Sequence, residues 1–148
     1  MEEGENKKNF SKQGKLNRSK GRRFEAKVRA NLESLGWVID KWTNTVDYEK
    51  NKIVPAKRKF NPFSKVFSMG TGFPDFICIK KNDGEGYDII GLEVKMQGYL
   101  DKIEKGMCIW LLENKIFSKI LIAKKGGKRG EIEYIDFKRK YMNKENKV

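Results

Sequence analysis

Residues 74–95 decide the fold of this chain and read PDFICIKKNDGEGYDIIGLEVK. Two apolar runs rich in β-branched residues flank the polar segment 82–86, and this pattern is typical of a β-hairpin. With the chain reversal centred on Gly84, residues equally distant from it face each other across the two strands. Asp75 then lies opposite Glu93, and a shift of one residue in the register would separate them.

The predicted register gathers three charged side chains on one face of the hairpin. Directly opposed residues have Cβ atoms about 4.5–5.5 Å apart, and alternation along the strand puts Lys95 on the same face as Glu93. Two carboxylates this close repel each other, and a divalent cation between them relieves the repulsion. A simpler alternative is that Asp75 caps a turn while Glu93 and Lys95 form an ion pair or a polar stripe facing solvent.

The composition of the Glu93 strand favours the first interpretation. Apolar residues occupy both of its faces, at Ile89, Ile90, Leu92 and Val94, which predicts a central strand of the sheet. A buried carboxylate then needs a hydrogen-bonding partner or a cation.

The chain contains no histidine. Hydrolases with Ser-His-Asp or Cys-His machinery, nucleases with a histidine base and histidine-containing zinc sites are therefore excluded. The two cysteines, Cys78 and Cys108, lie in apolar contexts and are expected to be reduced core residues. No apolar run approaches the ~18 residues of a membrane span, so we expect a soluble, intracellular, cytoplasmic protein with no membrane partner.

Phosphodiester hydrolysis by carboxylates and lysines needs a hard cation such as Mg²⁺, which activates water and stabilises the leaving oxygen. Because Mg²⁺ keeps several waters, two or three protein oxygens suffice to bind it. We expect Asp75 and Glu93 to be ligands, together with the backbone carbonyl of Val94. Lys95 would hold the attacking water or the scissile phosphate.

Two further residues complete the predicted catalytic set. Glu25 lies beside the apolar stripe of a predicted helix and could add a metal ligand if the fold brings it near; the alternative is an ordinary surface glutamate. Gln97 continues the alternation of Glu93 and Lys95, if the strand extends that far, and could contact water or phosphate.

The net charge of +13 indicates a polyanionic partner. Basic residues concentrate in three blocks, over 1–30, 41–70 and 124–148, around a nearly neutral centre. Such blocks suit nucleic acid, whereas the alternative is solubility together with disordered basic tails. The residues expected to bind nucleic acid are Arg22, Arg23, Lys57, Arg58, Lys59, Lys124, Lys125, Lys128 and Arg129.

The remaining periodicities predict two helices and three more strands. The helices are expected at 19–36 and 99–114, and the strands at 37–42, 117–123 and 131–137. A helical crossover makes the strand at 117–123 parallel to the second hairpin strand. The expected fold is therefore α/β, with a mixed central β-sheet flanked by helices.

We expect residues 18–137 to form a single domain. A flexible basic arm over 1–17 would precede it, and a charged tail over 138–148 would follow it. Residues 43–70 show no clear period and interleave basic residues with aromatics, so a long inserted loop is expected that contacts phosphates and unstacked bases. Alternatively, these aromatic side chains pack the loop onto the domain.

Pro74-Asp75, followed by Glu93-Val94-Lys95, resembles the signature of the PD-(D/E)xK nuclease superfamily. The helix that carries Glu25 resembles the N-terminal glutamate helix of its Holliday-junction-resolvase-like and VRR-NUC-like branches. The resemblance covers roughly residues 21–124. It implies a restriction-endonuclease-like α-β-β-β-α-β core that binds Mg²⁺ or Mn²⁺ and cuts DNA.

The sequence thus suggests a metal-dependent endodeoxyribonuclease that selects duplex or branched DNA by its structure. A homodimer would suit this reaction, because symmetric cutting of two strands needs two sites. One alternative is a non-catalytic nucleic-acid-binding protein that retains the nuclease fold. Another is a structural protein with basic tails.

Overall fold

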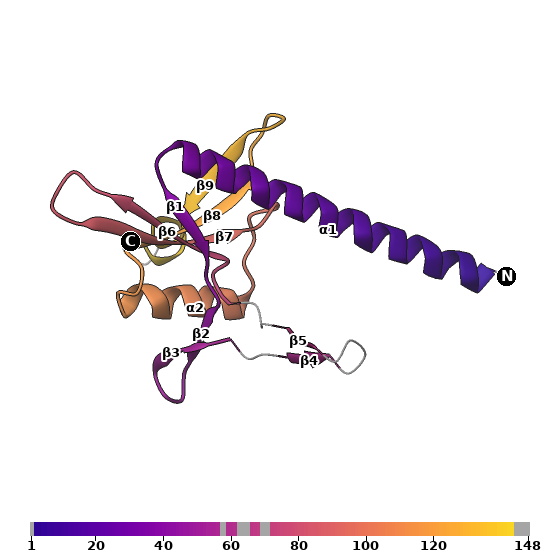
Figure 1. Cartoon of the computed structure of the whole chain (residues 1–148), viewed down its shortest axis with the longest axis horizontal. Coiled ribbons are helices and arrows are strands. Elements are labelled where there is room, and N and C mark those ends of the chain that lie inside the picture. The colour runs from indigo at the N-terminus through magenta and orange to yellow at the C-terminus, as the bar shows by residue number, and fades with distance from the viewer. Residues whose placement is uncertain (1, 57–58, 62–65, 69–71, 144–148) are drawn as a thin grey trace.

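A mixed five-stranded sheet, with the hairpin of residues 76–94 inside it, forms the centre of the computed structural model (Figure 1). The structure describes residues 2–56, 59–61, 66–68 and 72–143. Across the sheet the strands follow the order β1 (Val38–Lys41), β6 (Phe76–Lys81), β7 (Tyr87–Val94), β8 (Lys119–Lys125) and β9 (Ile132–Asp136). The expected α/β class and mixed sheet are confirmed.

The register of the hairpin is the predicted one. Ile77 pairs with Gly91 and Ile79 with Ile89 in the antiparallel β6–β7 ladder. Asn82 closes the turn, because its side-chain oxygen accepts hydrogen bonds from the backbone N–H groups of Gly84, at 2.9 Å, and Gly86, at 3.3 Å. This use of an asparagine side chain is common in tight turns.

Helix α2 (Lys102–Glu113) connects β7 to β8, and the two strands are parallel, as predicted. The strand expected at 131–137 is present as β9, which pairs antiparallel with β8 at the edge of the sheet. Strand β7 is therefore the middle strand of the sheet, with β6 on one side and β8 on the other. Its C-terminal end carries Glu93.

Helices cover both faces of the sheet. Helix α1 (Glu2–Ser34) packs Phe24, Val28 and Leu32 against one face. On the other face, Cys108 and Leu111 of α2 pack among buried side chains of β8 and its neighbours. Alternation along β7 and β8 therefore decides which helix each side chain meets.

The flexible arm expected over residues 1–17 is wrong, because the structure shows a helix there. Helix α1 begins at Glu2, so residues 2–17 are helical and continuous with the expected helix instead of a flexible arm. Lys, Glu and Gln are strong helix formers and proline is absent before Pro55. This polar extension has no regular apolar stripe, so its sequence shows no helical periodicity. It projects beyond the sheet (Figure 1).

The expected long loop over 43–70 contains two small antiparallel hairpins. Strands β2 (Asn44–Asp47) and β3 (Lys52–Pro55) form one, and β4 (Lys59–Asn61) and β5 (Val66–Ser68) form the other. The first is fixed to α2 by a 2.9 Å hydrogen bond from the Trp110 indole N–H to the Asn51 side chain. Tertiary contacts of this kind leave no periodic pattern in the sequence.

The expected charged tail begins as packed structure. Residues Lys138–Met142 form a single helical turn, η1, after the buried Phe137. The ring of Tyr141 lies 5.0 Å from that of Phe137, which ties the turn to the domain. Residues 144–148 of the tail lie outside the described part. Among the helices described, none has a stretch apolar enough and long enough to span a bilayer.

Leu92→Ala should lower the free energy of unfolding by about 2–5 kcal/mol, because the side chain is fully buried between α1 and the sheet. Urea denaturation followed by circular dichroism measures the change. Ile103→Ala is the matched control, since Ile103 is 71% exposed and its loss should cost under about 0.5 kcal/mol. Equal effects of the two substitutions would contradict the assigned face of β7.

Candidate active site

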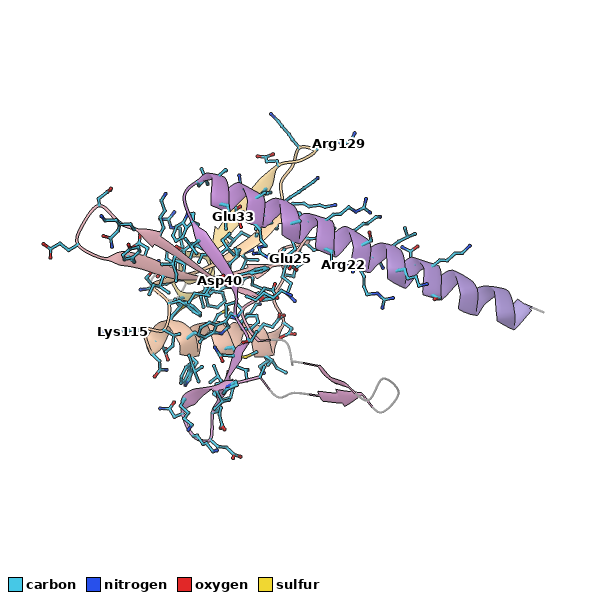
Figure 2. The ribbon with its side chains drawn as sticks, in the orientation of Figure 1. Arg22, Glu25, Glu33, Asp40, Lys115 and Arg129 are labelled. Carbon is cyan, nitrogen blue, oxygen red and sulfur yellow. The ribbon has the colours of Figure 1, made fainter. Side chains whose placement is uncertain are left out.

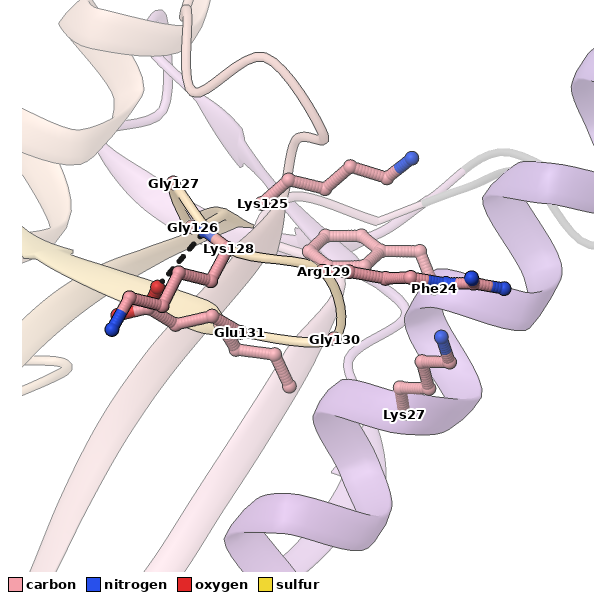
Figure 3. A pocket seen from close by; sticks show the side chains of 10 residues that line it. Phe24, Lys27, Lys125, Gly126, Gly127, Lys128, Arg129, Gly130 and Glu131 are labelled. Carbon is pink, nitrogen blue, oxygen red and sulfur yellow. Dashed lines mark hydrogen bonds between the residues drawn. The ribbon is translucent and has the colours of Figure 1, made fainter.

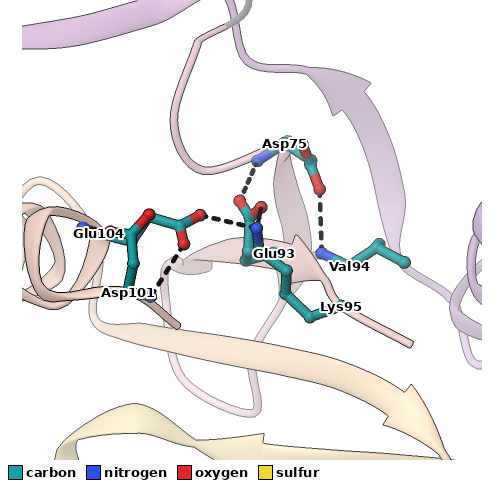
Figure 4. A network of polar contacts seen from close by, with 6 residues as sticks. All are labelled: Asp75, Glu93, Val94, Lys95, Asp101 and Glu104. Atoms are coloured by element: carbon teal, nitrogen blue, oxygen red, sulfur yellow. Dashed lines mark hydrogen bonds and ion pairs between the residues drawn. The ribbon is translucent and has the colours of Figure 1, made fainter. Parts of the chain in front are cut away.

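Asp75 and Glu93 face each other at the open end of the hairpin, where hydrogen bonds link the two strands (Figure 4). The backbone N–H of Asp75 donates to Glu93 Oε2 at 3.1 Å, and the N–H of Val94 donates to Asp75 Oδ2 at 3.0 Å. Each carboxylate thus replaces a backbone acceptor beyond the last pair of the β6–β7 ladder. The pairing of the two acidic residues that the sequence predicted is present.

Among the residues that the structure describes, Glu93 is the one charged residue that is buried, with 5% of its surface exposed. It lies on the α2 side of β7, as Gly91 does. A side chain larger than hydrogen at position 91 would meet Phe117. Burial, followed by the charge of Asp75, raises the pKa of Glu93 to about 9, against the opposing effect of Lys95. At neutral pH the carboxyl therefore holds its proton in the absence of a cation.

Asp75 shares this environment to a smaller degree. Burial raises the pKa of its carboxyl above the usual value, while the hydrogen bond from Val94 lowers it. Two adjacent carboxyl groups with raised pKa values form a site where positive charge is favoured.

Lys95 bridges the acidic pair and the start of α2. Its Nζ lies 2.9 Å from Glu104 Oε2 and 3.9 Å from Glu93 Oε1. Burial alone would lower the pKa of Lys95, but the hydrogen bond and charge of Glu104, with the charges of Glu93 and Asp75, raise it. The ammonium group therefore stays charged beside the carboxylates.

Glu104 is a site residue that the sequence analysis missed. Its Oε1 accepts from the N–H of Asp101 at 3.0 Å, and Asp101 Oδ1 accepts from the N–H of Glu104 at 2.8 Å. This capping box starts α2. The Asp-x-x-Glu spacing was available as a helix-start signal, whereas the contact with Lys95 arises only because α2 folds back beside the end of β7.

The structure does not bring Glu25 or Gln97 into the cluster. Glu25 is half-buried on the flank of α1 that also carries Arg29, whose guanidinium lies 5.4 Å from the Phe76 ring. Gln97 is exposed, because a turn closed by the Gly98 N–H and the Lys95 carbonyl ends the alternation of the strand. Among the described residues, no hydrogen bond or ion pair joins either side chain to Asp75, Glu93 or Lys95, so the catalytic role of both stays a prediction.

The oxygen donors at the cluster limit how a cation could be held. In the described ranges, no three cysteine or acidic side chains are grouped closely enough to enclose a metal ion. A cation here would therefore rest on Asp75, Glu93 and water. The N–H and C=O of a strand residue point the same way, so the Val94 carbonyl is directed toward Asp75, as its N–H is.

The basic residues predicted to bind nucleic acid divide into two groups. Arg23, Lys125, Lys128 and Arg129 meet at a groove between α1 and the β8–β9 turn, where Lys20 and Lys27 join them. Two others do not line it: Arg22 is exposed on α1, and Lys124 lies 3.8 Å from Glu133. Lys59 is the first residue of β4. Lys57 and Arg58 lie outside the described residues.

Comparison with protein-family models, with curated proteins and with solved structures finds no match for this chain.

The raised pKa of Glu93 predicts a falling stability with rising pH. Between about pH 4.5 and 9 the folded state keeps a proton that the unfolded state has released, so the free energy of unfolding drops by up to ~1.4 kcal/mol per pH unit. Urea denaturation in EDTA from pH 5 to 9 should show this slope in the wild type and lose it in Glu93→Gln. Glu133→Gln, at an exposed position, should retain it; an unchanged slope in Glu93→Gln would show that Glu93 titrates normally.

Glu104→Gln should separate the two roles of Glu104. Glutamine can still accept from Asp101 and keep the capping box, but it removes the charge that raises the pKa of Lys95. We expect a lower Lys95 pKa by NMR titration with nearly unchanged stability. Glu104→Ala should lower the pKa equally and also cost about 1 kcal/mol of unfolding free energy. A Lys95 pKa insensitive to both substitutions would contradict the ion pair.

Proposed function

We propose that this chain is a metal-dependent endodeoxyribonuclease and that Asp75, Glu93 and Lys95 form its active centre. The observation that carries the proposal is the buried Glu93 carboxyl, paired with Asp75 and lying 3.9 Å from the Lys95 ammonium group. This arrangement is unfavourable for the protein alone, because burial raises the pKa values of both acids and the charge of Asp75 raises that of Glu93 further. A divalent cation offsets that cost.

The donor set fits Mg²⁺, with Mn²⁺ able to substitute. Mg²⁺ is commonly held by one or two carboxylates and several waters, which matches the pair of acids at the end of β7. Asp75 and Glu93 would hold the cation with help from the Val94 carbonyl. When bound, it would supply activated water and stabilise the leaving oxygen.

Lys95 would position the attacking water or an oxygen of the scissile phosphate. Its Nζ is fixed by Glu104 rather than free in solvent, which reduces the entropy lost when substrate binds. With histidine absent from the chain, the acids and Lys95 are the groups that can direct proton transfer here.

The topology supports the nuclease interpretation. Leaving aside the two small hairpins β2–β3 and β4–β5, the elements run α1, β1, β6, β7, α2 and β8. This is the α-β-β-β-α-β order that the resemblance to PD-(D/E)xK nucleases implies, with the acidic pair at the expected place. A restriction-endonuclease-like core is therefore part of the proposal.

DNA is the proposed substrate because of the charge distribution. The chain carries a net charge of +13, and cations gather at the end of the sheet where the acidic pair lies. By the resemblance, we propose structure-selective cutting of duplex or branched DNA, of the junction-resolvase-like or VRR-NUC-like kind. A homodimer would present two such centres to two strands.

Purified protein should nick supercoiled plasmid or cut labelled four-way junctions in Mg²⁺ or Mn²⁺, and EDTA should abolish cleavage. Glu93→Gln and Asp75→Asn should reduce the rate by about 100-fold or more, since they remove the groups that hold the cation. Asp83→Asn, an acid-to-amide change in the exposed hairpin turn, is the matched control and should cut like the wild type. If the wild type and Glu93→Gln are equally inert while both bind DNA, the alternative of a non-catalytic nucleic-acid-binding protein holds.

A further inference from the structure

A basic groove lies on the sheet face opposite to the acidic cluster, and Figure 3 shows side chains that line part of it. Its walls are α1 and the turn between β8 and β9. Two adjoining cavities of about 360 and 250 Å³ make it up, and they share Phe24, Lys27 and Lys125. Phe24 is buried and lines both cavities, so they adjoin along α1.

The charge of this basic groove is strongly one-sided. Its cations are Lys20, Arg23, Lys27, Lys125, Lys128 and Arg129. In the part of the chain that the structure describes, none of them forms an ion pair with a carboxylate. The single acid on its wall, Glu131, accepts a 3.1 Å hydrogen bond from the Lys128 backbone N–H and so serves the turn itself.

Local sequence explains why these cations converge. Lys20, Arg23 and Lys27 recur at spacings of three and four, which places them on one flank of α1. The facing turn needs small residues: a side chain at Gly126 would meet Glu131 at 2.6 Å, and Gly130 adopts a φ of +80°. Nothing lies within 4 Å of the Cβ position at Gly127 or Gly130, so this part of the turn leaves its backbone open to an anion.

The groove and the acidic cluster lie at the same end of the sheet. The Lys95 N–H bonds to the Ala123 carbonyl and the Lys125 N–H to the Met96 carbonyl, so the two lysines sit on neighbouring strand ends. Their side chains point to opposite faces, Lys95 toward α2 and Lys125 toward α1. A polymer bound at both places must pass around this end of the sheet.

We propose that the basic groove binds the phosphate backbone of DNA at a position away from the phosphate that is cleaved. The inference rests on the proposed function and adds a second contact surface to it. An extended polyanion fits better than a single phosphate, because lysines and arginines continue along α1 beyond the groove, at Lys12, Lys15 and Arg18. Figure 2 shows side chains along α1 beyond Arg22. The groove is a site for affinity and not for bond breakage.

The test measures binding in EDTA, where no cleavage occurs. Fluorescence anisotropy of a labelled 30-base-pair duplex would compare Lys27→Gln/Lys125→Gln with Lys81→Gln/Lys119→Gln. The control pair removes the same charge from exposed positions at the opposite end of the sheet. The groove variant should bind about tenfold more weakly, and the slope of log Kd against log salt should fall by about two. The control should change binding by less than about twofold.

A variant that retains the charge distinguishes loss of charge from misfolding. Lys27→Arg/Lys125→Arg should restore binding, which a damaged fold would not allow. Equal weakening by the groove and control pairs would overturn the groove and leave only general charge attraction. Undiminished binding by the groove variant would also overturn it, without affecting the proposed nuclease. Conversely, groove-dependent binding by a protein that never cuts DNA would retain the groove and remove the proposed catalysis.

Discussion

The structure depends on the register of the β6–β7 hairpin. The Asn82 side chain fixes the turn at one end, and the reciprocal hydrogen bonds between Asp75, Glu93 and Val94 fix the other. A slip of one residue would rotate Glu93 to the α1 side of β7, where Leu92 now packs in the core. A buried carboxylate among those apolar side chains would have no partner. The same constraint therefore sets both the packing of the sheet and the meeting of the two acids.

Helix α2 links the fold to the site through one side chain. Glu104 caps the helix with one carboxylate oxygen and holds Lys95 with the other. Any shift of α2 along the sheet would break the cap or the ion pair. Because Glu104 holds Lys95, the Lys95 ammonium stays 3.9 Å from Glu93 Oε1. At that distance it lowers the pKa of Glu93 by less than burial and Asp75 raise it. The site is thus a strained electrostatic balance that a divalent cation would complete.

The two faces of the sheet separate two kinds of charge. The α2 face gathers the acids and Lys95, whereas the α1 face gathers the cations of the basic groove. Both lie at the C-terminal ends of β7 and β8, where the extension of α1 projects (Figure 1).

The sequence by itself determined the elements whose signals are local. Period-two and helical patterns located β6, β7, β8 and α2, and the position of Gly84 placed Asp75 opposite Glu93, because strand pairing follows directly from turn geometry. Only the tertiary structure decided the rest. The contact between Glu104 and Lys95 joins residues of different elements, Glu25 and Gln97 lie apart from the acids, and the basic groove needs α1 to meet the β8–β9 turn. Such outcomes depend on how packed layers bring distant segments together, and no periodicity within a segment encodes that distance.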